Sequence, residues 1–208
     1  MPGAAHRALG LATLAFALCF SVWGLIAPLA PRFQELYGLS DTQISLVIAT
    51  PVLLGSLFRI PAGILADRFG GRRVFTGMLL FLVLPVVLIG FFGGSFYGLL
   101  FWGFLLGVAG SSFAVGVPFV SKWFPPERQG VALGVYGVGN IGSALAAYAA
   151  PAIAGAWGWR WAFWVFAVPL LAMAAVFWAV GRDAPGGGPP PSLAEGLRLF
   201  REELGPWV

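Results

Sequence analysis

The sequence contains little charge for its length. Only 10% of its 208 residues are charged, whereas soluble domains carry about 25%. Hydrophobic residues make up 59%, and the mean hydropathy is +0.89. A soluble domain could not bury so much apolar surface, but a lipid bilayer accommodates it. The composition therefore predicts an integral membrane protein. The net charge of +4 does not indicate nucleic-acid binding, because most of the basic residues flank apolar segments.

Cysteine and histidine are almost missing. Cys19 is the single cysteine and His6 the single histidine, so one chain can form neither a disulfide nor a multi-cysteine metal site. No combination of nucleophile and base stands out. The sequence therefore predicts no enzymatic activity, no metal site and no cofactor. Cys19 lies in an apolar run and is expected to be a small buried thiol.

Long apolar runs dominate the sequence instead. Six of them reach the roughly 20 residues that a helix needs to cross the hydrocarbon core. They cover residues 10–31, 43–66, 74–93, 95–121, 129–154 and 160–181. The first run is too long for a signal peptide and predicts a retained helix. The expected fold is an all-α membrane protein, with a bundle of six transmembrane helices over residues 1–182.

The basic residues indicate an orientation. Two of the twelve, Arg32 and Arg160, fall on one side of the predicted spans, and Arg59 lies within a span. The other nine fall on the opposite side: Arg7, Arg68, Arg72, Arg73, Lys122, Arg128, Arg182, Arg198 and Arg201. Since loops rich in Lys and Arg stay on the cytoplasmic side, we expect both termini in the cytoplasm and the bundle in the inner or plasma membrane.

The C-terminal residues predict a separate element. Residues 183–191 form a Gly/Pro linker. Residues 192–205 begin with a capping-box pattern and continue with apolar residues at helical spacing. This predicts an amphipathic helix on the cytoplasmic membrane surface. Residues 206–208 would begin a seventh spanning helix.

Arg59 is the one charged residue that lies away from the ends of the predicted spans. Burying an arginine there costs at least about 2.5–3.5 kcal/mol on insertion scales, and such residues usually mark a binding site or a pathway. Pro51, Gly55, Arg59 and Gly63 recur every four residues, so Arg59 is expected to share a face with small packing residues. With no carboxylate nearby, its guanidinium favours a planar oxyanion held by two parallel hydrogen bonds. The alternative is a structural arginine that neutralises backbone carbonyls.

The fifth predicted span is rich in glycine and contains Asn140. Its glycines predict close helix packing: Gly134, Gly137, Gly139 and Gly142. The Asn140 amide needs polar partners in hydrocarbon. From the helical rise, Asn140 lies about 16 Å and Arg59 about 12 Å from the same membrane side. The two side chains are therefore expected at similar depth.

Residues 63–73 read Gly-Ile-Leu-Ala-Asp-Arg-Phe-Gly-Gly-Arg-Arg. Gly63 would allow a close helix contact and Gly70 a tight reversal. Alone, the segment could be an ordinary basic loop. It resembles, however, the G-x-x-x-D-R-x-G-x-R-R loop motif of the major facilitator superfamily at every position: Gly63, Asp67, Arg68, Gly70, Arg72 and Arg73. That resemblance implies a cytoplasmic gate, which braces the two halves of a transporter when it is open to the outside.

A second segment, residues 155–164, resembles the Gly-Trp-Arg-x-x-Phe segment common in that superfamily. An interfacial aromatic belt would also explain it. The two segments would occupy corresponding loops of the three-plus-three inverted repeat that this resemblance implies for the N-terminal half of the fold. The symmetry stays an expectation at this point, because the sequence shows no residue-level repeat strong enough to prove it.

The resemblance becomes narrower in the glycine-rich span. Gly134-x-x-Gly137-x-Gly139-Asn140-x-Gly142 is similar to the nitrate motif of the nitrate/nitrite porter family. Arg59 matches the substrate-binding arginine of that family. Phe113 falls where the family has an aromatic residue against the anion, although a packing role is the simpler explanation for it. The resemblance implies a secondary transporter of a small inorganic anion that works by alternating access, with a partner C-terminal six-helix half beyond these residues.

Other interpretations stay open. The transporter could carry another small organic anion, or the chain could be a half that transports nothing without its partner; a channel is a further alternative. The sequence does not decide between nitrate and nitrite. The lack of carboxylates within the predicted spans favours anion exchange over proton symport, but the partner half could supply a titratable group.

Overall fold

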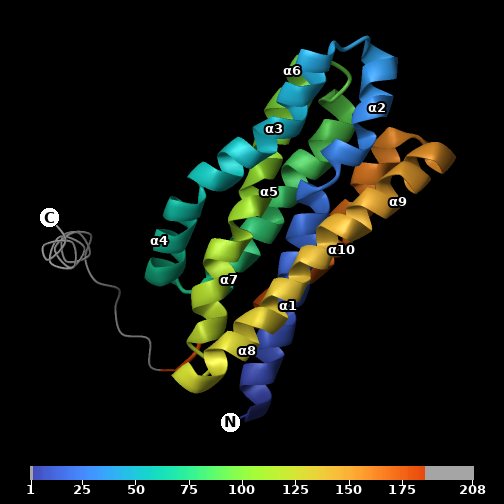
Figure 1. Cartoon of the computed structure of the whole chain (residues 1–208). Helices are drawn as coiled ribbons and strands as arrows, with labels where there is room; N and C mark the ends of the chain where they lie inside the picture. The colour runs from blue at the N-terminus through green and yellow to red at the C-terminus, as the bar shows by residue number, and fades with distance from the viewer. Residues whose placement is uncertain (1, 186–208) are drawn as a thin grey trace, which may run out of the picture.

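The computed structural model describes residues 2–185, and nearly all of them are helical (Figure 1). In chain order the elements are α1 (Pro2–Trp23), α2 (Ile26–Tyr37), α3 (Asp41–Leu57), α4 (Arg59–Phe69), α5 (Gly71–Phe92), α6 (Phe96–Leu106), the 3₁₀ segment η1 (Gly107–Ser111), α7 (Ser112–Ser121), α8 (Pro126–Gly137), the 3₁₀ segment η2 (Val138–Asn140), α9 (Ile141–Trp157) and α10 (Trp159–Val180).

The described helices provide five stretches that are long and apolar enough to cross a membrane. The number rises to six when α3 and α4, which meet at a bend of 41°, are counted as one broken span. This confirms the predicted all-α membrane fold. The first stretch differs most from expectation, because it covers Gly3–Tyr37 rather than 10–31. Hydropathy marks only the apolar part of a helix, whereas the helix itself continues to Gly38, which ends it with a positive φ of 59°.

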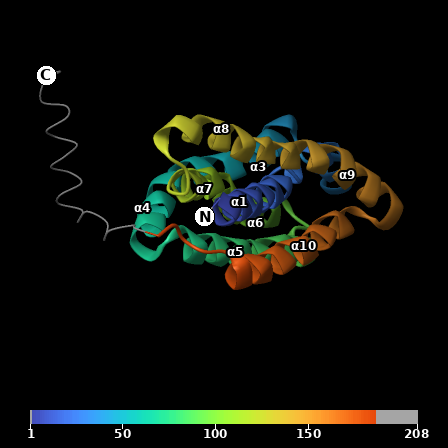
Figure 2. The same ribbon diagram turned by 90° about the horizontal axis from the view of Figure 1, so that it is seen from below.

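The helices are arranged around α1. Figure 2, a view along the bundle, shows α1 in the middle, α5 and α10 at one edge, and α8 and α9 at the opposite edge. The side chains of α1 are accordingly well buried, and Cys19 is fully buried as expected. The N-terminus, the turn at Gly70 and residues 122–125 lie at one end of the bundle, which we call the basic end (Figure 1).

Two of the helices, α5 and α10, form a closely packed antiparallel pair. Each contains 22 residues. Each begins directly after a glycine with almost the same unusual conformation, Gly70 with φ 86° and ψ 145° and Gly158 with φ 92° and ψ 154°. A side chain would be strained at this positive φ. The glycines therefore allow the same sharp reversal at opposite ends of the bundle.

An arginine follows each of these glycines and bonds across the pair. Arg72 donates from Nε to the carbonyl oxygen of Trp178 over 3.0 Å, and Arg160 donates from Nε to that of Gly90 over 2.9 Å. The two donors, Arg72 and Arg160, are 88 positions apart in the sequence, and the two acceptors, Gly90 and Trp178, are also 88 positions apart. The helices that begin at 71 and 159 thus have the same length and make equivalent contacts at these positions, as expected for an inverted repeat.

Most of the predicted tail lies outside the described residues. This applies to residues 186–191 of the linker, to the amphipathic helix at 192–205 and to residues 206–208, which stay predictions. Helix α10 ends at Val180, and residues 181–185 are not helical.

Candidate functional site

Each of the three predicted substrate-binding residues lies at an irregular point of its span, which is the 41° bend for Arg59 and a short 3₁₀ stretch for Phe113 and Asn140. We call these three points breaks. Arg59 is the first residue of α4, directly after the bend at Phe58. Phe113 is the second residue of α7, which follows η1. Asn140 is the last residue of η2. Short 3₁₀ stretches within helices often mark functional positions, and broken spans form the binding sites of many transporters. The prediction placed these residues within continuous helices.

Arg59 does not continue the buried face on which it was expected. Pro51 and Gly55 are buried, whereas Arg59 is exposed. A Cβ at Gly55 would lie 2.9 Å from the carbonyl oxygen of Gly107, so α3 packs directly against the backbone of η1. The 41° bend then changes the direction of the span. At Gly63 an added Cβ would meet no atom within 4 Å, so the expected close contact is not made within the described residues.

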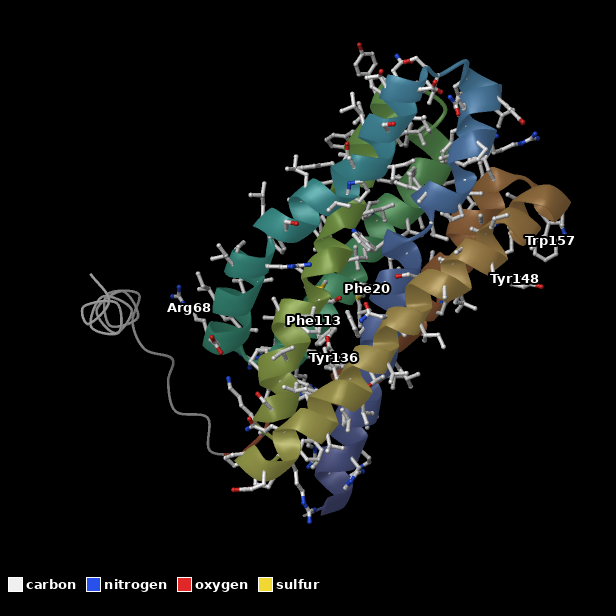
Figure 3. All side chains as sticks on the ribbon, in the orientation of Figure 1. Phe20, Arg68, Phe113, Tyr136, Tyr148 and Trp157 are labelled. Carbon is white, nitrogen blue, oxygen red and sulfur yellow. The ribbon has the colours of Figure 1, made fainter. Side chains whose placement is uncertain are left out.

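Phe113 belongs to an aromatic cluster in the middle of the bundle (Figure 3). Its ring centroid lies 5.7 Å from that of Phe16 and 5.9 Å from that of Tyr136. Tyr136 is fully buried and donates from its hydroxyl group to the carbonyl oxygen of Ser112 over 3.0 Å. Tyr136 therefore positions the start of α7. Phe113 remains 43% exposed, which leaves part of its ring available to a ligand.

Asn140 is exposed, and its amide nitrogen donates to the carbonyl oxygen of Gly137 over 3.1 Å. A Cβ at Gly142 would collide with the backbone of Ala17 on α1, and one at Gly139 would collide with Phe16. At Gly134 and Gly137 an added Cβ would meet nothing within 4 Å. Among the described residues, only the second pair of glycines makes the close helix crossing.

The three candidate residues come from three different spans. Within residues 2–185 no hydrogen bond or ring contact joins any two of them. Arg59 has neither an ion pair nor a hydrogen bond to another described residue. Its guanidinium therefore retains all its donors for a ligand.

The predicted gate segment connects several elements at the basic end. Asp67 lies near the end of α4, and Lys122 lies directly after α7. The Asp67 carboxylate accepts a hydrogen bond from Nζ of Lys122 over 3.2 Å. Both side chains are about half exposed. Figure 3 shows Arg68 at the outer side of α4, where its guanidinium lies 5.5 Å from the ring centroid of Phe69.

The other half of the gate segment is tied to the end of α10. The backbone N–H of Arg72 donates to Oδ1 of Asp183 over 3.0 Å. Asp183 thus satisfies an N–H at the start of α5, where the helix has no side-chain cap of its own. The side chain of Arg72 also donates to Trp178 and lies 4.7 Å from its ring centroid.

Comparison with known proteins identifies the family. The family model described as the Major Facilitator Superfamily matches residues 12–207. The chain belongs to the Major Facilitator Superfamily. As a member of this superfamily it has clear relatives among curated proteins. It is 43% identical over 184 residues to a probable nitrate/nitrite antiporter NarK1 of Thermus thermophilus, with 83% of this chain and 41% of that protein covered.

Two further relatives carry similar names. The chain is 41% identical over 177 residues to a probable nitrate/nitrite transporter NarK2 of Mycobacterium tuberculosis, covering 84% of this chain and 45% of that protein. It is 44% identical over 155 residues to a nitrite extrusion protein of Bacillus subtilis, covering 74% of this chain and 39% of that protein. The chain thus spans less than half the length of these relatives.

Solved structures support the superfamily fold. A bacterial homologue of the human lysosomal transporter Spinster, in an inward-facing and unoccupied conformation, matches with a TM-score of 0.78 at 21% identity. The match covers 98% of this chain and 49% of that one. The POT family transporter PepTSo matches with a TM-score of 0.75 at 18% identity, covering 89% of this chain and 39% of that one. At these identities the likeness establishes the fold alone.

Sequence reasoning missed three residues that make long-range contacts in the described structure: Tyr136, Lys122 and Asp183. Tyr136 stands within the glycine-rich span, and its hydroxyl group in an apolar helix was a signal for a buried hydrogen bond. From the sequence, Lys122 indicates only membrane topology and Asp183 only the start of the linker. Lys122 contacts Asp67, which is 55 residues away in the sequence, and Asp183 contacts Arg72, which is 111 residues away. A local sequence pattern does not predict contacts over such separations.

Proposed function

We propose that this chain is part of a secondary transporter that moves nitrate and nitrite across the membrane by alternating access. It would contribute one side of the anion site, and a second six-helix half would complete the pathway. The observation that carries this proposal is the placement of Arg59, Phe113 and Asn140 beside breaks in three spans. The names of the curated relatives support the same substrates.

Arg59 would supply the charge of the site. A guanidinium presents two parallel N–H donors that match a planar oxyanion, and none of the donors of Arg59 is used by another described residue. Asn140 would add a neutral polar group, and Phe113 would pack its exposed ring against the planar face of the anion. These roles require no catalytic group, so we propose transport rather than enzymatic chemistry.

The segment from Gly63 to Arg73 would form the gate at the basic end. The pair between Asp67 and Lys122 joins the end of α4 to the end of α7, and the bonds of Arg72 join the start of α5 to the end of α10. These contacts would make the end of this half move as one unit against its partner. By the positive-inside rule the basic end would face the cytoplasm, in the inner or plasma membrane.

Transport assays with a panel of anions test the substrate. The transporter that contains this chain is reconstituted in proteoliposomes. Uptake of isotopically labelled nitrite is then measured in the presence of unlabelled nitrite, nitrate, acetate or formate as competitors. We expect unlabelled nitrate and nitrite to compete strongly and acetate weakly. Strong competition by the carboxylates would instead support the organic-anion alternative. No uptake by the 208 residues alone, but uptake by the longer protein, would support the dependence on a partner half.

The orientation has its own test, which uses the buried position of Cys19. Because Cys19 is fully buried, a membrane-impermeant maleimide should label only introduced cysteines. Gly3→Cys, at the basic end, should react only after the cells are permeabilised. Glu35→Cys, near the end of α2, should react in intact cells. The reversed pattern would contradict the proposed orientation.

A further inference from the structure

Two hollows of similar size lie on either side of α5. The first, which we call the aliphatic hollow, has a volume of about 490 Å³ and is lined by residues of α3 to α6 and η1. The second, the arginine hollow, has a volume of about 460 Å³ and lies between α5 and α10. Both volumes fall within the range of small-molecule sites, about 300–1,000 Å³.

The lining of the aliphatic hollow suits a hydrocarbon chain. All of its lining residues are apolar or glycine, among them Phe58, Leu65, Val74, Phe81 and Val108. From Val74 to Phe81 the helical rise is about 10 Å, so the hollow extends from the basic end towards the middle of the bundle. Phe58 lies at the bend between α3 and α4, and the hollow is therefore formed where this span departs from its neighbour.

The arginine hollow changes character with depth. Arg73 and Trp178 lie towards the basic end, whereas Leu80 and Leu171 lie deeper. Tryptophan is favoured at the level of lipid headgroups, and Trp178 is 52% exposed. The hollow thus offers a cation and an aromatic ring at headgroup depth, with aliphatic side chains below them.

Arg73 has no described counterion. Its neighbours in the gate segment are engaged, since Asp67 pairs with Lys122 and Asp183 accepts from the backbone of Arg72. Among residues 2–185 no hydrogen bond or ion pair involves the exposed Arg73. An anion that reaches this point from the membrane surface would find the guanidinium available, together with the favourable start of α5.

Gly77 is the one residue that lines both hollows. It lies one helical turn deeper than Arg73, and an added Cβ there would meet no atom within 4 Å. We propose that the two hollows bind the two acyl chains of one anionic phospholipid, with Gly77 between the chains and the phosphate on Arg73. The edge of the bundle formed by α5 and α10 (Figure 2) faces lipid in this arrangement.

Native mass spectrometry tests this site. The protein is released from nanodiscs that contain equal amounts of phosphatidylglycerol and phosphatidylcholine with the same chains. We expect one retained phospholipid, with phosphatidylglycerol favoured about fivefold, which is what one basic residue near a membrane surface contributes. In Gly77→Leu the new side chain fills the space between the chains, and retention should fall several-fold. Arg73→Gln should retain a lipid but lose the headgroup preference.

Ala172→Leu provides the matched control. Ala172 is exposed on α10 and lines neither hollow, so the same kind of enlargement should leave retention at the wild-type level. If Gly77→Leu fails to fold, Leu171→Trp in the wall of the arginine hollow replaces it, since Leu171 is 54% exposed. Equal retention in Gly77→Leu and Ala172→Leu would overturn the proposal. So would an unchanged headgroup preference in Arg73→Gln.

Discussion

Arg160 donates from Nε to the carbonyl oxygen of Gly90 over 2.9 Å, and so joins the start of α10 to the end of α5. Its guanidinium also lies 5.2 Å from the ring centroid of Trp159. Arg72 makes the corresponding bond to Trp178 at the other end of the same pair. An arginine therefore joins α5 to α10 at each end of the pair. Both bonds go to backbone carbonyl oxygens, so they do not depend on the identity of the acceptor residue.

We expect Arg160→Gln to destabilise the protein by about 1.5–3 kcal/mol, the usual contribution of a hydrogen bond to a charged group. Thermal unfolding in mild detergent, followed with a thiol-reactive dye, measures this effect. Cys19 is fully buried and is the only cysteine in the sequence, so the dye reports the opening of the core around α1.

Arg32→Gln is the control for this measurement. Arg32 pairs with Glu35 on an exposed surface over 3.4 Å, and such pairs contribute only about 0–1 kcal/mol. A loss in Arg160→Gln no larger than in Arg32→Gln would show that the bond to Gly90 does not hold the helix pair together.

The glycines of the fifth span allow a second prediction, because they fall into two classes. Gly142→Ala should be strongly destabilising, since its Cβ would collide with the backbone of Ala17 and overpacking costs about 1–3 kcal/mol. Gly134→Ala adds the same methyl group in open space and should be neutral or stabilising, as alanine favours the helix by about 1 kcal/mol. The same dye-based unfolding assay compares the two variants. Equal losses would contradict the packing of η2 and α9 against α1.

Sequence reasoning predicted the spans well because hydropathy accumulates over many residues. The limits of α5 and α10 lie within three residues of those expected. The breaks were not predicted, since they depend on contacts between spans. The close approach of Gly55 to Gly107, for example, brings α3 against η1, and neither glycine is unusual in its own helix.

One feature of the fold was readable and was missed. Residues 70–75 and 158–163 both follow the pattern Gly-x-Arg-x-x-Phe, 88 positions apart. Phe75 and Phe163 are fully buried, so all three matching residues have equivalent structural tasks. Comparison of the two loop motifs position by position would have found the repeat. The site residues stay predictions, because no hydrogen bond or ring contact joins any two of them within residues 2–185.

Arg59 is the residue on which the proposed anion site depends most. In the transporter that contains this chain, we expect Arg59→Lys to weaken nitrite binding about 10- to 100-fold, because the ammonium group cannot provide two parallel donors and charged hydrogen bonds contribute about 1.5–3 kcal/mol. Uptake at increasing nitrite concentration measures this as a rise in KM. Arg32→Lys makes the same change at an exposed position remote from the breaks and should transport normally. Normal affinity in Arg59→Lys would remove Arg59 from the site.

Asp67 and Lys122 allow the gate to be tested separately from the anion site. Removal of either side chain breaks the pair between α4 and the end of α7. We expect Asp67→Asn and Lys122→Met each to lower the maximal uptake rate without a large change in KM, because the pair lies at the basic end and away from the breaks that carry Arg59 and Asn140.

A double-mutant cycle decides whether these two residues act as a pair. If they do, the double variant Asp67→Asn/Lys122→Met should be no slower than the worse single variant. The two effects on the rate should then deviate from additivity by an amount equivalent to about 0.2–1 kcal/mol, as for other exposed ion pairs.

Higher salt should reduce the wild-type rate towards that of the variants, because both side chains are about half exposed and screening weakens such pairs. Additive effects in the cycle would instead mean that Asp67 and Lys122 affect the rate independently and do not act as a pair.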